Sequence, residues 1–214
     1  MGTKEDILEQ LVEEFLIHRG YFVRHNVKFL PRKDHIDFIS NQDSNHSDID
    51  VLAFSPTRQG ADRVWAVSCK SWQAGFDPAT KIDEIEQKKK VAGREAWKGF
   101  RELVSPKWSE AFMATILAAT GESSFTYVTA VTKLIGDAQK WETHPPFRRA
   151  IADNPIKVLT LRGMLEEVYG ELKMTLAGTE VGRMLQLFRA AGVPISAEGQ
   201  DVRTKRSDGK HLIH

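Results

Sequence analysis

Asp48-Ile49-Asp50-Val51-Leu52-Ala53-Phe54 begins the stretch of sequence that decides the fold. A polar turn follows it, and a second apolar run, Val64–Val67, then leads into Ser68-Cys69-Lys70. Two short apolar runs separated by a turn that contains Pro and Gly are typical of two neighbouring β-strands. Lys70 follows Asp50 by 20 residues, which is enough for two strands of ordinary length and the turn between them. The sequence therefore predicts that an acid and a lysine from adjacent strands lie close together.

The chemistry of these side chains indicates phosphodiester hydrolysis. Side chains alternate between the two faces of a strand, so Ser68 and Lys70 are expected on one face and Cys69 on the other. The Asp50 carboxylate is a hard oxygen ligand of the kind that suits Mg²⁺ or Mn²⁺. A neighbouring lysine can orient a water molecule and offset charge on a phosphate. Asp48 is an alternative for the key aspartate, one step further from the apolar run.

This arrangement resembles the PD-(D/E)XK nuclease superfamily, in which an aspartate on one strand is followed by an acid, any residue and a lysine on the next. Asp50 matches the aspartate and Lys70 the lysine, whereas Ile49 replaces the family's proline and Ser68 its second acid. The resemblance implies a restriction-endonuclease-like α/β/α sandwich with a central mixed sheet. It also implies cleavage of DNA with Mg²⁺ or Mn²⁺ as cofactor, with the backbone carbonyl of Cys69 completing the metal shell.

The missing acid at Ser68 has a predicted replacement. One branch of type II restriction enzymes resembles this chain in having serine there, with the carboxylate supplied by a glutamate on the following helix, thirteen residues beyond the lysine. Residues 71–83 separate Lys70 from Glu84, so the spacing is the same. Glu84 is therefore a candidate metal ligand, and a solvated position on a helix rich in Glu and Lys is the alternative.

The beginning of the chain adds a further candidate ligand. Apolar residues recur with a helical period between Ile7 and Leu16, and Gly20 ends the predicted helix. In nucleases similar to this chain, a glutamate on the first helix reaches the metal. Glu9 lies where the resemblance would put that ligand, and Glu13 is the substitute one turn later. Positions that simply face water are the alternative for both.

The distribution of charge indicates where nucleic acid would bind. A net charge of +1 argues against an indiscriminate binder, but cations concentrate after the predicted lysine strand. They are Lys81, Lys88, Lys89, Lys90, Arg94 and Lys98. Lys88 and Lys89 are candidates for phosphate contacts and Trp72 for stacking on a base, with a solvated helix face and core packing as the alternatives. No feature of the sequence distinguishes DNA from RNA as the bound strand.

The rest of the chain completes the predicted order of helix, three strands, helix, strand, helix, strand. Helices are expected from Pro78, over 97–104 and 106–119, and over 137–152 with a break at Pro145-Pro146; strands are expected over 21–30, 125–132 and 156–161. Two more helices are predicted at 163–176 and 179–191. We expect a nuclease-like core at 1–175, a helical appendage at 176–195 and a flexible polar tail at 196–214.

The composition excludes several classes of protein. With 214 residues, 41% of them hydrophobic and 28% charged, the chain can bury a substantial core. No membrane-spanning run or signal peptide is recognisable, so a cytoplasmic protein without a membrane partner is expected. Cys69 is the only cysteine, which excludes an intramolecular disulfide and a Cys-rich zinc site. The apolar stripe over 179–191 fits a packing face within the chain or a homodimer contact.

Two other functions remain as alternatives. Ser68 would be the inactivating change in a nuclease fold that only binds nucleic acid or serves in assembly. A protein-interaction domain is the third possibility, and the stripe over 179–191 is its support.

Overall fold

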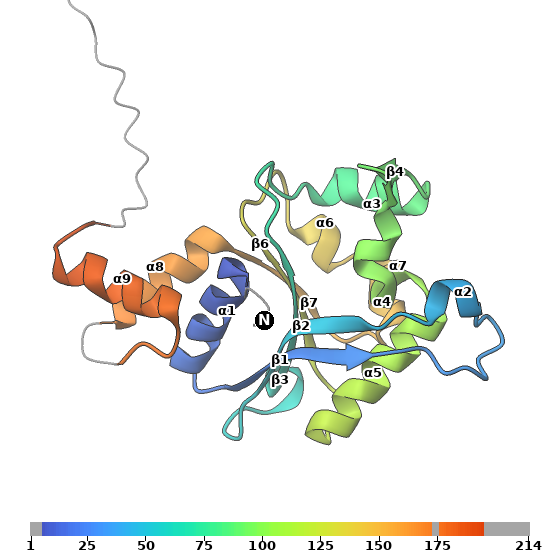
Figure 1. Cartoon of the computed structure of the whole chain (residues 1–214), viewed down its shortest axis with the longest axis horizontal. Coiled ribbons are helices and arrows are strands. Elements are labelled where there is room, and N and C mark those ends of the chain that lie inside the picture. Colours follow the sequence, from blue (N-terminus) through green and yellow to red (C-terminus); the bar gives the residue numbers. More distant parts are fainter. Residues whose placement is uncertain (1–5, 173–175, 195–214) are drawn as a thin grey trace, which may run out of the picture.

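A five-stranded mixed sheet lies at the centre of the fold (Figure 1). The computed structural model describes residues 6–172 and 176–194. The strands follow the order β1-β2-β3-β6-β7 across the sheet. Their bounds are Phe22–Phe29 for β1, Ser47–Phe54 for β2, Val64–Lys70 for β3, Thr126–Val131 for β6 and Ile156–Thr160 for β7. Helices cover both faces of this sheet, so the chain is an α/β protein.

The strand directions place the predicted acid and lysine at the same end of the sheet. β1, β2 and β3 are antiparallel to one another in turn, whereas β6 and β7 continue the sheet parallel to β3. Val51 of β2 lies opposite Val67 of β3, so the chain continues from this pair toward Asp50 on one strand and Lys70 on the other. Every residue of β6 is buried, which explains the nearly continuous apolar and β-branched run at this strand.

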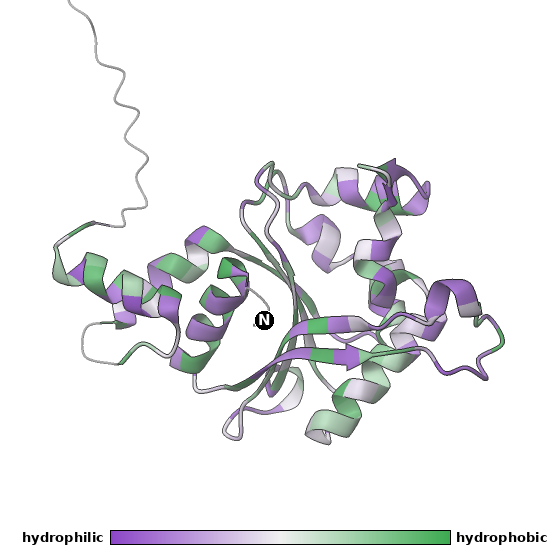
Figure 2. Ribbon diagram, in the orientation of Figure 1, coloured by the Kyte–Doolittle hydropathy of each residue, from purple (hydrophilic) through white to green (hydrophobic). Residues whose placement is uncertain are grey.

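Three helices cover one face of the sheet. They are α1 (Ile7–His18), α8 (Leu161–Glu171) and α9 (Glu180–Ala190). α1 begins where the Asp6 side chain accepts a hydrogen bond from the Leu8 N–H at 2.8 Å, and it ends before Gly20, whose φ is +80°. Figure 2 shows hydrophobic and hydrophilic residues alternating along all three helices, as expected for helices with one buried side. The predicted first helix is confirmed.

α9 belongs to this layer. Val181 and Leu185 of α9 are buried in the same hydrophobic core as α1 and α8. The buried Glu14 carboxylate of α1 accepts hydrogen bonds from the Gly178 N–H and from both the N–H and the hydroxyl of Thr179, which lead into α9. The described part of the predicted appendage at 176–195 therefore packs on the first helix. The predicted tail at 196–214 lies outside the described residues.

Five helices cover the other face. They are α3 (Pro78–Glu86), α4 (Arg101–Val104), α5 (Pro106–Thr120), α6 (Gln139–Glu142) and α7 (Pro145–Ala150). The predicted break at Pro145-Pro146 is confirmed, because α6 ends before it and α7 starts there. α5 has 15 residues, and no helix in the described part of the chain is long and apolar enough to cross a membrane.

Aromatic rings fill the space between these helices and the sheet. Trp141 lies in the middle, with its ring centroid 4.9 Å from Phe76, 4.8 Å from Phe100 and 4.8 Å from Phe147. All three pairs have the edge-to-face geometry that aromatic side chains prefer. Phe100 connects this cluster to the end of β3, where it lies under Lys70.

Several short elements differ from the prediction. The loop before β2 contains α2 (Ser40–Asp43), and the β2–β3 turn contains the 3₁₀ helix η1 (Gly60–Asp62). Between α3 and α4 the chain forms a hairpin of β4 (Lys90–Val91) and β5 (Arg94–Glu95), followed by the 3₁₀ helix η2 (Ala96–Phe100). The helical character expected over 97–104 is confirmed, and it is divided between the 3₁₀ helix η2 and the α-helix α4.

Candidate active site

The Asp50 carboxylate and the Lys70 ammonium group lie at the junction of β2 and β3, where the charge of Lys70 acts on Asp50 although the two groups form no ion pair with each other. Asp50 Oδ2 accepts a hydrogen bond from the backbone N–H of Cys69 at 2.6 Å, which fixes the carboxylate across the two strands. Burial raises the pKa of Asp50, and the charge of Lys70 and the Cys69 hydrogen bond oppose that rise. The acid and the lysine therefore share one electrostatic environment.

The residues of the Ser-Cys-Lys segment alternate between the faces of the sheet. Lys70 Nζ lies 5.2 Å from the centroid of the Phe100 ring, on the face that α3 to α7 cover, and Ser68 shares that face. Cys69 packs against the core on the α1 face. Burial, with help from nearby carboxylates, raises the pKa of the Cys69 thiol. The thiol is therefore protonated at neutral pH and is not an activated nucleophile.

Glu9 of α1 reaches the same region. Burial raises its pKa from 4.5 to about 7, and the negative charges of Asp50 and Asp6 add to the rise. His25 Nδ1 lies 4.0 Å from Glu9 Oε2, and its charge opposes the rise. Glu13 pairs instead with His25 Nε2 at 3.0 Å. Glu9 therefore lies within the electrostatic field of Asp50, and Glu13 is paired with His25.

The donor chemistry of Glu9 and Asp50 fits a hard divalent cation. Burial raises the pKa of both carboxylates, and the negative charge of Asp50 raises the pKa of Glu9 further. A cation bound by both groups would relieve this repulsion. Within residues 6–172 and 176–194, no group of three or more His, Cys, Asp or Glu side chains is assembled as a metal cluster. Two carboxylates are the number that Mg²⁺ usually takes from a protein, with water and substrate oxygens as its other ligands.

Glu102 is a further acid of this region that the sequence did not reveal. It lies on α4, its carboxyl group is buried, and its Oε1 accepts a hydrogen bond from the Tyr127 hydroxyl at 2.5 Å. Burial raises the pKa of Glu102, and the positive charge of Lys70 is the largest opposing influence. The Tyr127 hydroxyl also interacts with Ser68. A carboxyl group therefore lies on the face of Lys70 and Ser68, although residue 68 itself carries none.

The signal for Glu102 in the sequence is weak. The residue stands between the apolar side chains of Phe100 and Leu103 in a stretch expected to be helical, where a lone Glu usually faces solvent. Its partner, Tyr127, is 25 residues further along the chain. Only the tertiary structure brings the two groups together beneath Lys70.

Glu84 has a different partner in the structure. Its Oε2 lies 2.5 Å from Lys81 Nζ, one helical turn earlier on α3. In the described part of the chain, no hydrogen bond or ion pair connects Glu84 with Asp50 or Lys70. Thirteen residues separate Lys70 from Glu84, as in the resembled enzymes, but the two side chains are not in contact. The role of Glu84 as a metal ligand stays a prediction.

The residues predicted to bind nucleic acid lie in different surroundings. Trp72 packs against Phe76 and Phe100, and Lys81 Nζ lies 4.7 Å from its ring centroid. Lys89 pairs with Asp83 at 2.7 Å, and Lys88 is exposed just beyond the end of α3. Base stacking by Trp72 would therefore require Lys81 to move from that face of the ring.

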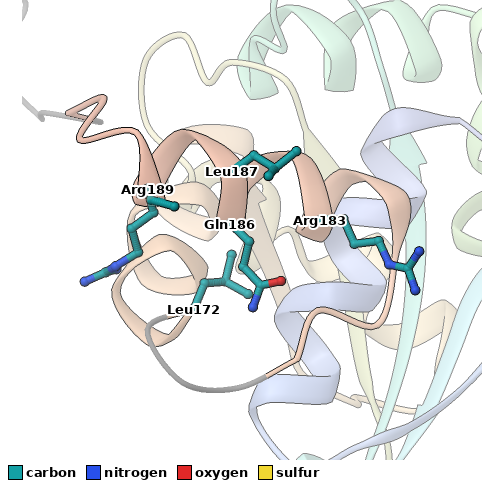
Figure 3. Close-up of a pocket in the computed structure, with 6 residues that line it drawn as sticks. Leu172, Arg183, Gln186, Leu187 and Arg189 are labelled. Carbon is teal, nitrogen blue, oxygen red and sulfur yellow. The ribbon is translucent and has the colours of Figure 1, made fainter.

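Two hollows of the surface differ in their relation to this region. One, of about 860 Å³, opens beside Lys70 and is bounded by the β4–β5 hairpin and η2. The other, of about 670 Å³, lies along the outer side of α9 (Figure 3). Its lining consists of Leu172, Arg183, Gln186, Leu187, Arg189 and Ala190. Lys70 lines the first hollow, whereas none of the residues around the second belongs to the candidate site, so the first hollow is the one that adjoins it.

Comparison with models of protein families, with curated proteins and with solved structures finds no match for this chain. The interpretation of the site therefore depends on its own side chains, above all on Asp50, Lys70 and Glu9.

The pKa of Glu9 leads to a prediction about stability. Glu9→Gln is expected to stabilise the metal-free protein near pH 8 and to leave its stability unchanged near pH 4. The folded protein binds the Glu9 proton more tightly, because the pKa is about 7 instead of 4.5. The resulting stabilisation is complete below the unfolded pKa and is lost as the pH rises through the folded pKa. After allowance for partial exposure to solvent, its size is about 1–2 kcal/mol.

Urea unfolding in the presence of a chelator, repeated across this pH range, measures the effect. The control is Glu13→Gln on the same helix, which removes the ion pair with His25 and is expected to bring no gain at pH 8. Parallel pH profiles for wild type and Glu9→Gln would contradict the assignment of the raised pKa to Glu9.

Proposed function

We propose that this chain is a metal-dependent phosphodiesterase that hydrolyses DNA and has a restriction-endonuclease-like fold. The observation that supports the proposal is that the Asp50 carboxylate, held by the Cys69 N–H at the junction of β2 and β3, lies within the electrostatic field of Lys70. The mixed sheet with helices on both faces, and the approach of Glu9 from the first helix, agree with it. The order of these elements along the chain is also the one that the sequence predicted.

Asp50 and Glu9 would hold the metal ion. Both carboxylates are partly buried and lie in each other's field, so they bind a cation more readily than two solvated acids would. The hydrogen bond from Cys69 keeps the Asp50 carboxylate oriented, and the neighbouring Cys69 carbonyl is the predicted third donor. Bound Mg²⁺ or Mn²⁺ would supply Lewis-acid stabilisation of charge on the scissile phosphate.

Lys70 would bring positive charge to the phosphate and orient the attacking water. Its ammonium group lies above the Phe100 ring and within the field of both Asp50 and Glu102. These groups attract the ammonium group and limit where it can move. Glu102, held by Tyr127, would thus act as a positioning residue for Lys70 on the side where Ser68 lacks a carboxylate.

The requirement for a metal ion gives the direct test. Purified protein is expected to cut DNA when Mg²⁺ or Mn²⁺ is present and to stop when a chelator removes the ion, because the carboxylates then repel the phosphate. Conversion of supercoiled plasmid to nicked and linear forms measures this reaction, and a labelled RNA strand in parallel tests the choice of substrate. Cleavage that persists unchanged in chelator would contradict the proposal.

A nuclease fold that binds nucleic acid without cutting it is the second candidate. The serine at position 68, where the resembled nucleases have an acid, favours it. Such a module would bind DNA equally well with and without the metal ion. The plasmid assay and a binding measurement in chelator distinguish the two functions.

A further inference from the structure

The hollow beside Lys70 is a pocket lined by cationic side chains. Its lining includes five cationic residues, one each from the end of β3, from α3, from the β4–β5 hairpin, from η2 and from α4. These are Lys70, Lys81, Arg94, Lys98 and Arg101. Because Lys70 belongs to both the pocket and the candidate site, a ligand in the pocket would lie directly beside the proposed point of cleavage.

The charge of the pocket differs sharply from that of the whole chain. The chain carries 30 Lys and Arg residues against 29 Asp and Glu. The lining of the pocket contains five cationic side chains and one carboxylate, that of Glu95. An excess of one sign inside a hollow focuses the field and attracts an oppositely charged ligand. The ligand that fits is therefore an anion.

Not all of this positive charge is satisfied within the protein. Lys98 pairs with Glu95 at 2.9 Å, and Lys81 pairs with Glu84 at 2.5 Å. Arg94 and Arg101 form no ion pair with any other residue that the structure describes. Burial lowers the pKa of Arg101, whose guanidinium group lies 4.3 Å from the centroid of the Trp108 ring. An anion in the pocket would offset this incompletely compensated charge.

We propose that this pocket binds the sugar–phosphate backbone of the nucleic-acid strand next to the phosphate that is cut. The proposal rests on the proposed function, because Lys70 links the two places. Separate cations on five elements suit the repeated phosphates of a strand, whereas a single phosphate group is usually held by consecutive backbone N–H groups at a glycine-rich turn. The side chain of Trp72 provides an apolar wall against which a sugar can pack.

The test uses the double variant Arg94→Ala/Lys98→Ala, because both side chains are exposed on short surface elements and their loss should not affect folding. Fluorescence anisotropy with short labelled DNA, in chelator and at several salt concentrations, measures binding. We expect about tenfold weaker binding. The slope of log affinity against log salt should also become shallower, by about 1.8 for a duplex or about 1.4 for a single strand, as for two lost phosphate contacts.

The matched control is Arg183→Ala/Arg189→Ala, which removes the same charge from α9 on the other side of the sheet (Figure 3). The control is expected to keep the affinity and salt slope of the wild type. Equal weakening by both double variants, no weakening by either, or no binding of DNA by the wild type would each overturn the assignment of the pocket.

Cleavage assays distinguish failure of this inference from failure of the proposed function. If the wild type cuts DNA and Arg94→Ala/Lys98→Ala cuts it with an unchanged KM, the pocket is not the strand site although the hydrolytic function stands. If the wild type binds DNA without cutting it, and only Arg94→Ala/Lys98→Ala binds it more weakly, the pocket stands as a strand-binding site and the hydrolytic function fails.

Discussion

Asp50→Asn is expected to reduce the rate of DNA cleavage by about 10³-fold or more, which corresponds to about 4 kcal/mol of transition-state stabilisation. The substitution removes the negative oxygen that would bind the metal ion. It should not weaken the fold, because the asparagine carbonyl can still accept the hydrogen bond from the Cys69 N–H. The variant also no longer buries a carboxylate whose pKa is raised mainly by burial. Plasmid cleavage and thermal unfolding, measured on the same preparations, check the two parts of this expectation.

Asp48→Asn provides the matched control, because Asp48 lies on the same strand but is exposed. It is expected to retain most of the activity. Lys70→Met keeps an extended side chain over Phe100 while it removes the charge, and it should lose cleavage to a similar extent as Asp50→Asn. Loss of activity in Asp48→Asn together with full activity in Asp50→Asn would show that Asp48, and not Asp50, is the key aspartate.

Gly182→Ala is expected to destabilise the protein by about 2–3 kcal/mol, although alanine is normally the better residue inside a helix. A Cβ atom at position 182 would overlap the carboxylate of Glu14. That carboxylate cannot swing aside without cost, because the Gly178 N–H, the Thr179 N–H and hydroxyl, and His18 Nε2 all bind it. The free energy of unfolding in urea measures the effect.

Gly170→Ala on α8 is the matched control, since a Cβ atom there would meet no other atom within 4 Å. This variant is expected to gain roughly 0.5–1 kcal/mol from helix propensity. A double-mutant cycle with Glu14→Ala isolates the cause, because Gly182→Ala should cost little once the carboxylate is gone. An equal cost of Gly182→Ala in both backgrounds would show that the overlap with Glu14 is not responsible.

The parts of the fold with strong local patterns could be predicted from the sequence. The turn between β2 and β3 joins two short apolar runs, and the alternation of side chains along β3 separates Cys69 from Ser68 and Lys70. The stripe on the first helix and the Pro145-Pro146 break in the α6–α7 region are similar local signals. In each case the spacing of apolar residues, or the restricted backbone of proline, determines the structure over a few neighbouring residues.

The β4–β5 hairpin shows what such patterns miss. The Glu- and Lys-rich run after Pro78 has the composition of one helix, but α3 ends at Glu86. The turn at Ala92 and Gly93 has positive φ at both residues, +47° and +80°, which is the backbone of a two-residue hairpin turn. Gly93 was the available signal, but alanine at the preceding position is an unusual choice for such a turn.

The composition of the candidate site was harder to predict than its position. Asp50 and Lys70 follow from two adjacent strands, whereas the contact of Glu102 with Tyr127 depends on how α4 packs over the sheet. Similarly, one turn of helix separates Glu9 from Glu13, and only the tertiary structure shows that Glu9 lies in the field of Asp50 while Glu13 forms the shorter pair with His25. Contacts between elements distant in sequence therefore decide which acids accompany the lysine.

The clasp that Glu14 forms with residues 178 and 179 also has a consequence for shortening the chain. A protein cut before residue 178 would leave a buried carboxylate on α1 without most of its donors. α1 also carries Glu9, so a shift of this helix would displace a proposed metal ligand as well. The last described helix is therefore a structural brace for the first, and truncation for crystallisation or fusion to a partner should begin only beyond it.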